Sequence, residues 1–256
     1  MNLPHRFAIA TSRDPGFVMP RLRTACDALG ELFATRVSGH LMVAYDDFVF
    51  GAEREDFAWM WLPPRIASQL LRDELAVPVA VPVRQGQTAF SMAIFTRYDH
   101  PDIHTLADVR DRSAAWVDRR SSSGYVVPRA RLAAAGIDPD EALGDVSMLR
   151  SHQAVVAAVL GGADDFGATY VRLDGDEVVD AGWKDRPVRV LDTCGPIPGD
   201  VLVAGRGTGA EQTAAARAAL LAEGPVCSAL AELIECDGFA AVTDAHLEAL
   251  LDLAPR

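Results

Sequence analysis

The chain has 256 residues, of which 50% are hydrophobic and 23% are charged, so it can bury a full core as one large domain or two smaller lobes. Its formal net charge of −12 argues against nucleic acid and against insertion into or binding to anionic membranes. The net charge does not exclude binding of a small anion, because local backbone N–H groups and helix dipoles can outweigh a distant net charge.

The sequence lacks the motifs of metal and cofactor chemistry. There is no CxxC pair, no Cys/His spacing of a metal site, no P-loop and no Ser/His/Asp order typical of a hydrolase. We therefore expect no metal, no cofactor, and cysteines that are reduced and mostly buried. The cysteines are Cys26, Cys194, Cys227 and Cys236.

The first six residues run directly into an apolar stretch at 7–10 that predicts a strand. No charged and apolar leader pattern precedes it, and no apolar run approaches the roughly 20 residues of a membrane span. As written, the sequence predicts a cytoplasmic protein, or a periplasmic one if a leader has been removed.

Short apolar runs alternate with amphipathic stretches along the chain, which predicts an α/β fold with a mostly parallel sheet. Pro64 suits the first turn of a helix that follows a buried strand ending at Pro63. Up to residue 120 we expect helices at 21–37, 65–75 and 105–110, and strands at 7–10, 41–44, 56–62, 77–83, 91–95 and 114–117.

A further helix is expected to begin at the segment Ser121-Ser122-Ser123-Gly124-Tyr125 and to stop at Gly136. Pro128 lies inside this helix and removes a hydrogen bond to the Gly124 carbonyl, so the first turn should be irregular. Beyond it we expect strands at 146–149, 167–173 and 188–191, a helix at 153–160, a proline-rich crossing, and two or three helices, one of them rich in alanine.

The serine segment is the strongest candidate for a binding site. A helix start presents unpaired N–H groups and the positive end of the helix dipole, and three hydroxyls add further donors, which together suit a phosphate-like anion. Gly124 would let the backbone approach the ligand. The alternative is an ordinary helix cap, since serine is favoured at that position in any protein.

Several ordered segments together resemble the phosphonate/phosphite/phosphate-type substrate-binding proteins of ABC transporters, which have the type 2 periplasmic-binding-protein fold. The segments are Asp56-Phe57-Ala58-Trp59, Ile103–Val109, Ser121–Arg129, Ala135–Pro139, Ser151–Val155, Gly162–Asp165 and Pro196–Asp200. The resemblance implies two α/β lobes, 1–94 plus 192–256 and 95–191, which are joined by two crossing segments and close over a ligand cleft.

The resemblance also implies site residues. Ser121, Ser122, Ser123, Gly124 and Tyr125 would hold the anionic group. His152, after the natural cap Ser151, matches the family's ligand-contacting histidine, and a bound anion would raise its pKa. The alternative for His152 is a solvated or capping side chain.

Other positions would complete the cleft. Tyr45 matches a tyrosine that faces it, or is a half-buried core residue. Phe90 falls near a position where family members often carry a second tyrosine. One hydroxyl contact to the ligand should therefore be missing here. Trp61 replaces a smaller residue and should wall the cleft with Trp59, one of the two being in the core because strand residues alternate between faces. Asp200 matches an acidic or polar position that can receive a ligand amine.

The expected function is non-catalytic capture of a small oxyanion, for uptake with an ABC permease or as a sensory domain for a signalling module. One alternative is a cytosolic enzyme on the same fold acting on a small carboxylate or phosphorylated metabolite. Another is the effector domain of a transcription regulator, but the chain has no room for the helix-turn-helix that normally precedes it.

Overall fold

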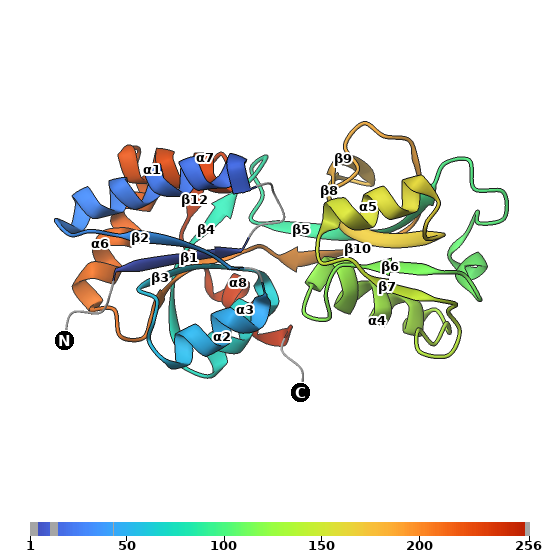
Figure 1. Cartoon of the computed structure of the whole chain (residues 1–256), viewed down its shortest axis with the longest axis horizontal. Coiled ribbons are helices and arrows are strands. Elements are labelled where there is room, and N and C mark those ends of the chain that lie inside the picture. Colours follow the sequence, from blue (N-terminus) through green and yellow to red (C-terminus); the bar gives the residue numbers. More distant parts are fainter. Residues whose placement is uncertain (1–4, 11–14, 43, 254–256) are drawn as a thin grey trace. The chain divides into compact units, whose positions relative to one another are not determined.

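The computed structural model describes residues 5–10, 15–42 and 44–253. The chain forms two compact units (Figure 1): unit 1 is Met1–Thr88 with Pro198–Arg256, and unit 2 is Ala89–Ile197. The boundaries at 88/89 and 197/198 each lie six residues outside the crossings expected from sequence at 94/95 and 191/192. Unit 2 is therefore somewhat larger than expected.

The sheet of unit 1 has the order β12-β4-β11-β3-β1-β2. Strands β1, β2, β3 and β4 run in one direction, while β11 and β12 run antiparallel to their neighbours. The strands are β1 Arg6–Ala10, β2 Ser38–Met42, β3 Trp59–Leu62, β4 Ala76–Val83, β11 Val201–Gly205 and β12 Gly238–Ala240.

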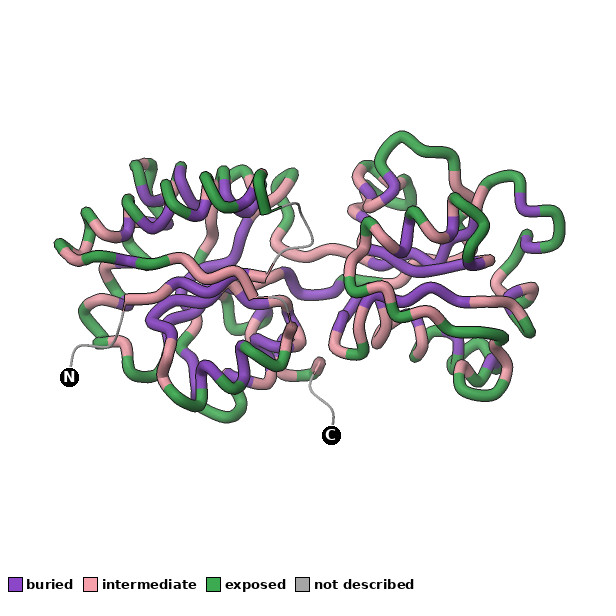
Figure 2. Tube along the Cα trace, in the orientation of Figure 1, coloured by how far each residue is buried: buried purple, intermediate pink, exposed green. Residues whose placement is uncertain are grey.

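Helices cover both faces of this sheet, and each face has its own hydrophobic core. In Figure 1, α1, α6 and α7 lie on one side and α2, α3 and α8 on the other. Figure 2 shows the buried strands between the partly exposed helices. The helices are α1 Pro15–Phe33, α2 Tyr45–Glu53, α3 Pro64–Arg72, α6 Ala210–Leu221, α7 Pro225–Ile234 and α8 Asp244–Asp252.

The sheet of unit 2 has the order β10-β5-β8-β6-β7, with β9 paired to β8. Strand β6 is parallel to β7 and β8, whereas β5 and β9 are antiparallel to β8. The strands are β5 Ala89–Arg97, β6 Ala114–Trp116, β7 Val146–Met148, β8 Phe166–Asp174, β9 Glu177–Ala181 and β10 Val188–Pro198.

The helices of unit 2 also divide between the two faces. On one face α5 (His152–Gly161) packs on Ala93, Phe95 and Val171. On the other face Tyr125 meets Trp116 and Trp116 meets Phe166, which places the serine turn η2 (Ser122–Val126) and α4 (Val127–Ala134) there. A short 3₁₀ turn, η1, spans Leu106–Val109.

The expectation of mostly parallel sheets is wrong, because β11, β12, β5 and β9 make both sheets mixed. The first helix spans Pro15–Phe33 rather than 21–37, since Ala34 takes a left-handed conformation (φ 49°) that ends it. Strand β3 begins at Trp59 rather than at Asp56. The elements not expected from sequence are α2, β9, β11 and β12.

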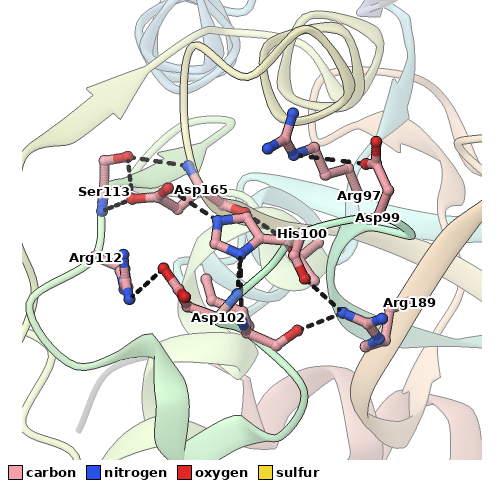
Figure 3. A network of polar contacts seen from close by, with 10 residues as sticks. Arg97, Asp99, His100, Asp102, Arg112, Ser113, Asp165 and Arg189 are labelled. Carbon is pink, nitrogen blue, oxygen red and sulfur yellow. Dashed lines mark hydrogen bonds and ion pairs between the residues drawn. The ribbon is translucent and has the colours of Figure 1, made fainter.

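A polar network holds the loop after β5 at the edge of unit 2 where β8 begins (Figure 3). The Asp165 carboxylate accepts from the Ser113 N–H and hydroxyl, both at 2.9 Å, and lies 3.2 Å from His100 Nε2. On the other side of the ring, Nδ1 accepts from the N–H groups of Asp102 and Ile103. Nε2 therefore carries the proton and donates it to Asp165.

These bonds have a structural role and not the geometry of a nucleophilic triad. The Asp165 carboxylate stands between the Ser113 hydroxyl and the His100 ring, so the imidazole does not contact the serine it would have to activate. Burial alone would raise the pKa of Asp165, but the hydrogen bonds from Ser113 and His100 outweigh it and the pKa is lowered. The network thus holds an ionised carboxylate.

Replacing Asp165 with alanine should lower the free energy of unfolding by about 3 kcal/mol, because it leaves the Ser113 N–H and the buried His100 ring without their acceptor. The control is Asp99→Ala, which removes a surface pair with Arg97 (3.6 Å) from the same loop and should change stability by less than about 0.5 kcal/mol. Urea unfolding measures both. Equal effects would contradict a structural role for the network.

Candidate anion site

Two neighbouring strands of the unit 2 sheet lead into helix starts at the same edge of the sheet. The parallel strands β6 and β7 end together, with Trp116 opposite Met148, and the ladder continues as the Arg150 N–H donates to the Val117 carbonyl at 2.7 Å. Each strand then leads into a helix start. Ligands in open α/β sheets bind beyond the carboxyl ends of parallel strands, so this edge is the natural place for a site.

The first of these helices opens with one turn of π-helix, and Pro128 explains why. In a regular helix the Gly124 carbonyl would accept from the N–H of residue 128, which proline lacks. The carbonyl accepts instead from the Val117 N–H at the end of β6, at 3.1 Å, and the bonds of the turn span five residues. The irregular first turn expected from Pro128 is confirmed.

The three serines of this turn differ in what their hydroxyls do. All are buried, with 4%, 6% and 3% of Ser121, Ser122 and Ser123 exposed. Ser121 caps the turn by accepting the Gly124 N–H at 3.1 Å. The buried Ser122 hydroxyl has no hydrogen-bond partner among the described residues. Such an oxygen costs about 1–3 kcal/mol, so Ser122 points to a group from outside the chain.

Gly124 is required by packing inside the unit. A Cβ at this position would lie 2.3 Å from Cγ2 of Val117, closer than any real contact. This packing requirement adds to the expected close approach of the Gly124 backbone to a ligand, which stays a prediction. The missing side chain lets the turn close onto the end of β6, which brings the serines to the sheet edge.

Tyr125 is half-buried and fixed by aromatic contacts. Its ring meets Trp116 edge-on, with centroids 6.2 Å apart and planes at 88°, and the Arg129 guanidinium lies 5.0 Å from its centroid. Trp116 in turn meets Phe166 of β8. These contacts anchor the serine turn on the core of unit 2.

His152 is the first residue of α5, where the Ser151 hydroxyl caps the helix by accepting the Ala154 N–H at 3.1 Å. Its Nδ1 lies 3.0 Å from the hydroxyl of Thr169 on β8, and its ring meets Tyr170 edge-on. Burial lowers the pKa of His152 to about 4, so the ring is neutral at pH 7. Thr169, which sequence reasoning missed, has no motif around it that marks its role.

Phe90 lies near the start of β5 and is half-buried. Residues alternate along the strand, so Phe90 shares a face with Met92 and not with Ala93, which packs under α5. That face carries the serine turn. Unit 2 therefore contains the serine turn, His152 and Phe90 among the predicted site residues, and the serine turn and His152 follow neighbouring strands that end at the same edge.

The remaining predicted residues belong to unit 1. Tyr45 is the first residue of α2 and packs partly buried on the core under α2, α3 and α8. Trp59 and Trp61 are two residues apart and therefore share one face of β3, contrary to the expectation that they face opposite ways. Trp59 is buried and Trp61 is partly buried on the same core.

Asp200 and Trp61 both contact Arg84, a residue that sequence reasoning did not single out. The Arg84 guanidinium lies 3.8 Å from the Asp200 carboxylate and 6.0 Å from the Trp61 ring, and it donates to the Ile234 and Glu235 carbonyls at the end of α7. Arg84 thus caps α7 and neutralises Asp200. An amine-binding role for Asp200 would have to compete with this ion pair.

The cysteines are free, and only Cys26 is buried, where burial and then the charge of Asp27 raise its pKa to about 12. Cys194, Cys227 and Cys236 are partly exposed, so the expectation of mostly buried thiols is wrong.

The described residues contain no group of His, Cys, Asp and Glu that could hold a metal ion. Within the same residues no single helix is long and apolar enough to span a membrane; α6 and α7 reach that length only together, across a 77° bend.

A family model described as "ABC transporter, phosphonate, periplasmic substrate-binding protein" matches residues 7–247. The chain belongs to this family. It is a solute-binding protein of the phosphonate ABC transporter type, as the ordered motifs indicated. No curated protein matches its sequence significantly.

Solved structures of similar proteins show the fold. XAC2383 from Xanthomonas citri, in a structure with chloride, is 21% identical over 97% of this chain and 95% of its own, with a TM-score of 0.78. A binding protein component of an ABC phosphonate transporter from Pseudomonas aeruginosa is 20% identical over 98% and 86%, with a TM-score of 0.80.

PhnD1 from Prochlorococcus marinus, in complex with methylphosphonate, is 15% identical over 97% of this chain and 96% of its own, with a TM-score of 0.78. The chain therefore has the type 2 periplasmic-binding-protein fold. The expectation of that fold is confirmed.

Replacing Gly124 with alanine should destabilise the protein by about 1–3 kcal/mol, because the new methyl group would collide with Val117. Gly161→Ala, on α5 of the same unit, is the control: nothing lies within 4 Å of its Cβ position, and alanine should be neutral or stabilising by up to about 1 kcal/mol. Urea denaturation compares them. A neutral Gly124→Ala would refute the packing argument.

The pH dependence of stability should carry a signature of His152. Its folded pKa of about 4 lies below the ordinary value of 6.5, so between these two pH values the unfolded chain binds a proton that the folded chain does not. Stability should fall on acidification through this window by up to about 3 kcal/mol. His152→Gln removes this contribution, so its stability should fall less between pH 7 and pH 5 in thermal unfolding. Identical slopes would contradict a neutral His152 with a lowered pKa.

Proposed function

We propose that this protein binds a small oxyanion of the phosphonate, phosphite or phosphate type at the serine turn and His152, and delivers it to an ABC permease without chemical turnover. The observation that carries the proposal is the Ser122 hydroxyl, buried and unpaired among the described residues at a helix start. The other donors of the proposed site would be the first N–H groups of the turn and the neutral imidazole of His152 at the start of α5.

Two further lines support the proposal. The family takes its description from phosphonate transport, and PhnD1, which shares the fold, was solved with methylphosphonate. The edge of the sheet where the two helices begin is also the common ligand position in open α/β sheets. Tyr45, Phe90, Trp61 and Asp200 stay predicted contacts for the rest of the ligand.

A thermal-shift screen with methylphosphonate, phosphite, phosphate, sulfate and arsenate tests the proposal. A ligand at 100 times its Kd should stabilise the protein by about 2.7 kcal/mol. Ser122→Ala should weaken binding about 10- to 100-fold, because it removes a hydrogen bond to a charged group. The absence of any shift with all five anions would overturn the proposal.

Ser68→Ala is a matched control. Ser68 is also a fully buried serine whose hydroxyl has no partner among the described residues, but it lies in the middle of α3 in unit 1. Its substitution should leave the ligand-induced shift unchanged. If Ser68→Ala and Ser122→Ala reduce the shift equally, the effect is on stability and the anion does not bind at the serine turn.

A further inference from the structure

The hydroxyl of Thr169 faces His152 and has no other hydrogen-bond partner within the described part of the chain. Thr169 is completely buried in β8, and its Oγ1 lies 3.0 Å from His152 Nδ1. Gly182 covers it from the other side, since a Cβ on that glycine would lie 2.4 Å from Oγ1. The hydroxyl is therefore closed off from solvent.

A buried hydroxyl must give its proton to an acceptor, and here the acceptor within reach is His152 Nδ1. Nδ1 can accept only when the ring proton is on Nε2. In the opposite tautomer Nδ1–H would donate to Thr169, and the threonine proton would be buried without a partner. Satisfying the hydroxyl thus selects one tautomer of the histidine.

We propose that Thr169 fixes His152 as the Nε2–H tautomer, so that the anion site of unit 2 offers hydrogen-bond donors and selects oxyanions that carry no proton on the bound group. This inference rests on the proposed function, because it concerns the same site. Thr169 acts as a positioning residue: it sets what the histidine presents to the ligand.

The other groups of the site agree with this assignment. The N–H groups at the start of the serine turn can only donate, and the Ser121 oxygen already accepts from Gly124. The Ser122 hydroxyl can both donate and accept, whereas the backbone N–H groups and Nε2–H can only donate. Each proton on the bound group therefore occupies an oxygen for which the site supplies a donor, and a fully ionised group pairs with more of these donors.

The charged groups around α5 leave His152 neutral. On β8, Tyr170 meets the ring edge-on and Arg172 is paired with Asp180 of β9 at 2.6 Å. Strand β6 contributes no titratable group, and Arg97 of β5 lies by Gly162 at the opposite end of α5. Burial alone accounts for the lowered pKa of His152. The imidazole therefore keeps one proton across the neutral pH range.

This selection separates two classes of ligand. A sulfonate carries no proton at any pH near neutrality, so it should bind with the same affinity throughout. An alkylphosphonate loses its second proton near neutral pH. Below this second pKa one proton must be released on binding, so the affinity should fall about tenfold for each pH unit. The site should thus accept both methanesulfonate and the methylphosphonate dianion.

The first test needs no ligand. ¹⁵N NMR of histidine-labelled protein should show His152 as the Nε2–H tautomer, with the signal assigned by its absence in His152→Gln. Thr169→Val should shift the ring toward a mixture of tautomers. Thr96→Val is the control: Thr96 is equally buried on the neighbouring strand, but its hydroxyl donates to the Asp165 carbonyl at 2.6 Å. A proton on Nδ1 in the unmodified protein would overturn the proposal, even if Thr169→Val does not fold.

The second test is calorimetric titration with methylphosphonate and methanesulfonate between pH 5.5 and 8.5. We expect a falling affinity for methylphosphonate toward acid pH and a constant one for methanesulfonate. Equal binding of the phosphonate monoanion, or no binding of methanesulfonate where methylphosphonate binds, would overturn the selection of unprotonated groups. If neither ligand binds at any pH, the proposed selection fails, whereas the proposed function is judged by the five-anion screen and the tautomer by the NMR measurement.

Discussion

The hydrogen bond from the Val117 N–H to the Gly124 carbonyl ties the serine turn to the sheet, and the geometry of the site follows from it. Three residues make this bond possible. Pro128 supplies no N–H and so frees the carbonyl, Gly124 has no side chain to push the turn away, and Val117 extends β6 by one residue. The π-turn that results places three buried serines at the edge of the sheet. The irregular π-turn is therefore required for the proposed site to form.

The serines of the turn and the neutral His152 carry no formal positive charge, in a chain with a net charge of −12. In the proposed site, the attraction for an anion would come from N–H groups, buried hydroxyls and a neutral ring, because such dipoles act more strongly there than in water. The affinity of such a site depends on the hydrogen-bonding pattern of the ligand as much as on its charge. That property would let the proposed site admit an anion in a chain whose net charge repels anions in general.

Much of the fold was accessible from sequence because the deciding residues act locally. Pro64 opens α3, Gly136 and Gly162 take left-handed conformations after helices, and Pro128 marks the irregular turn. The elements that were missed depend on distant partners. The strand β11 pairs with β3 and β4, which precede it by more than a hundred residues, and nothing in its five residues reveals that pairing. For the site, the serines and His152 were visible as motifs, whereas Thr169 and Arg84 matter only through side chains that the fold brings to them.

The position of β11 between β3 and β4 has a consequence for how the protein forms. Unit 2 is one continuous stretch of chain, but the centre of the unit 1 sheet is supplied by residues synthesised after all of unit 2. During synthesis the N-terminal strands β1–β3 and the strand β4 must wait for their shared neighbour, while unit 2 already has every strand of its own sheet. Unit 2 can therefore complete its sheet on the ribosome before unit 1 does, although the first strands of unit 1 are synthesised earlier.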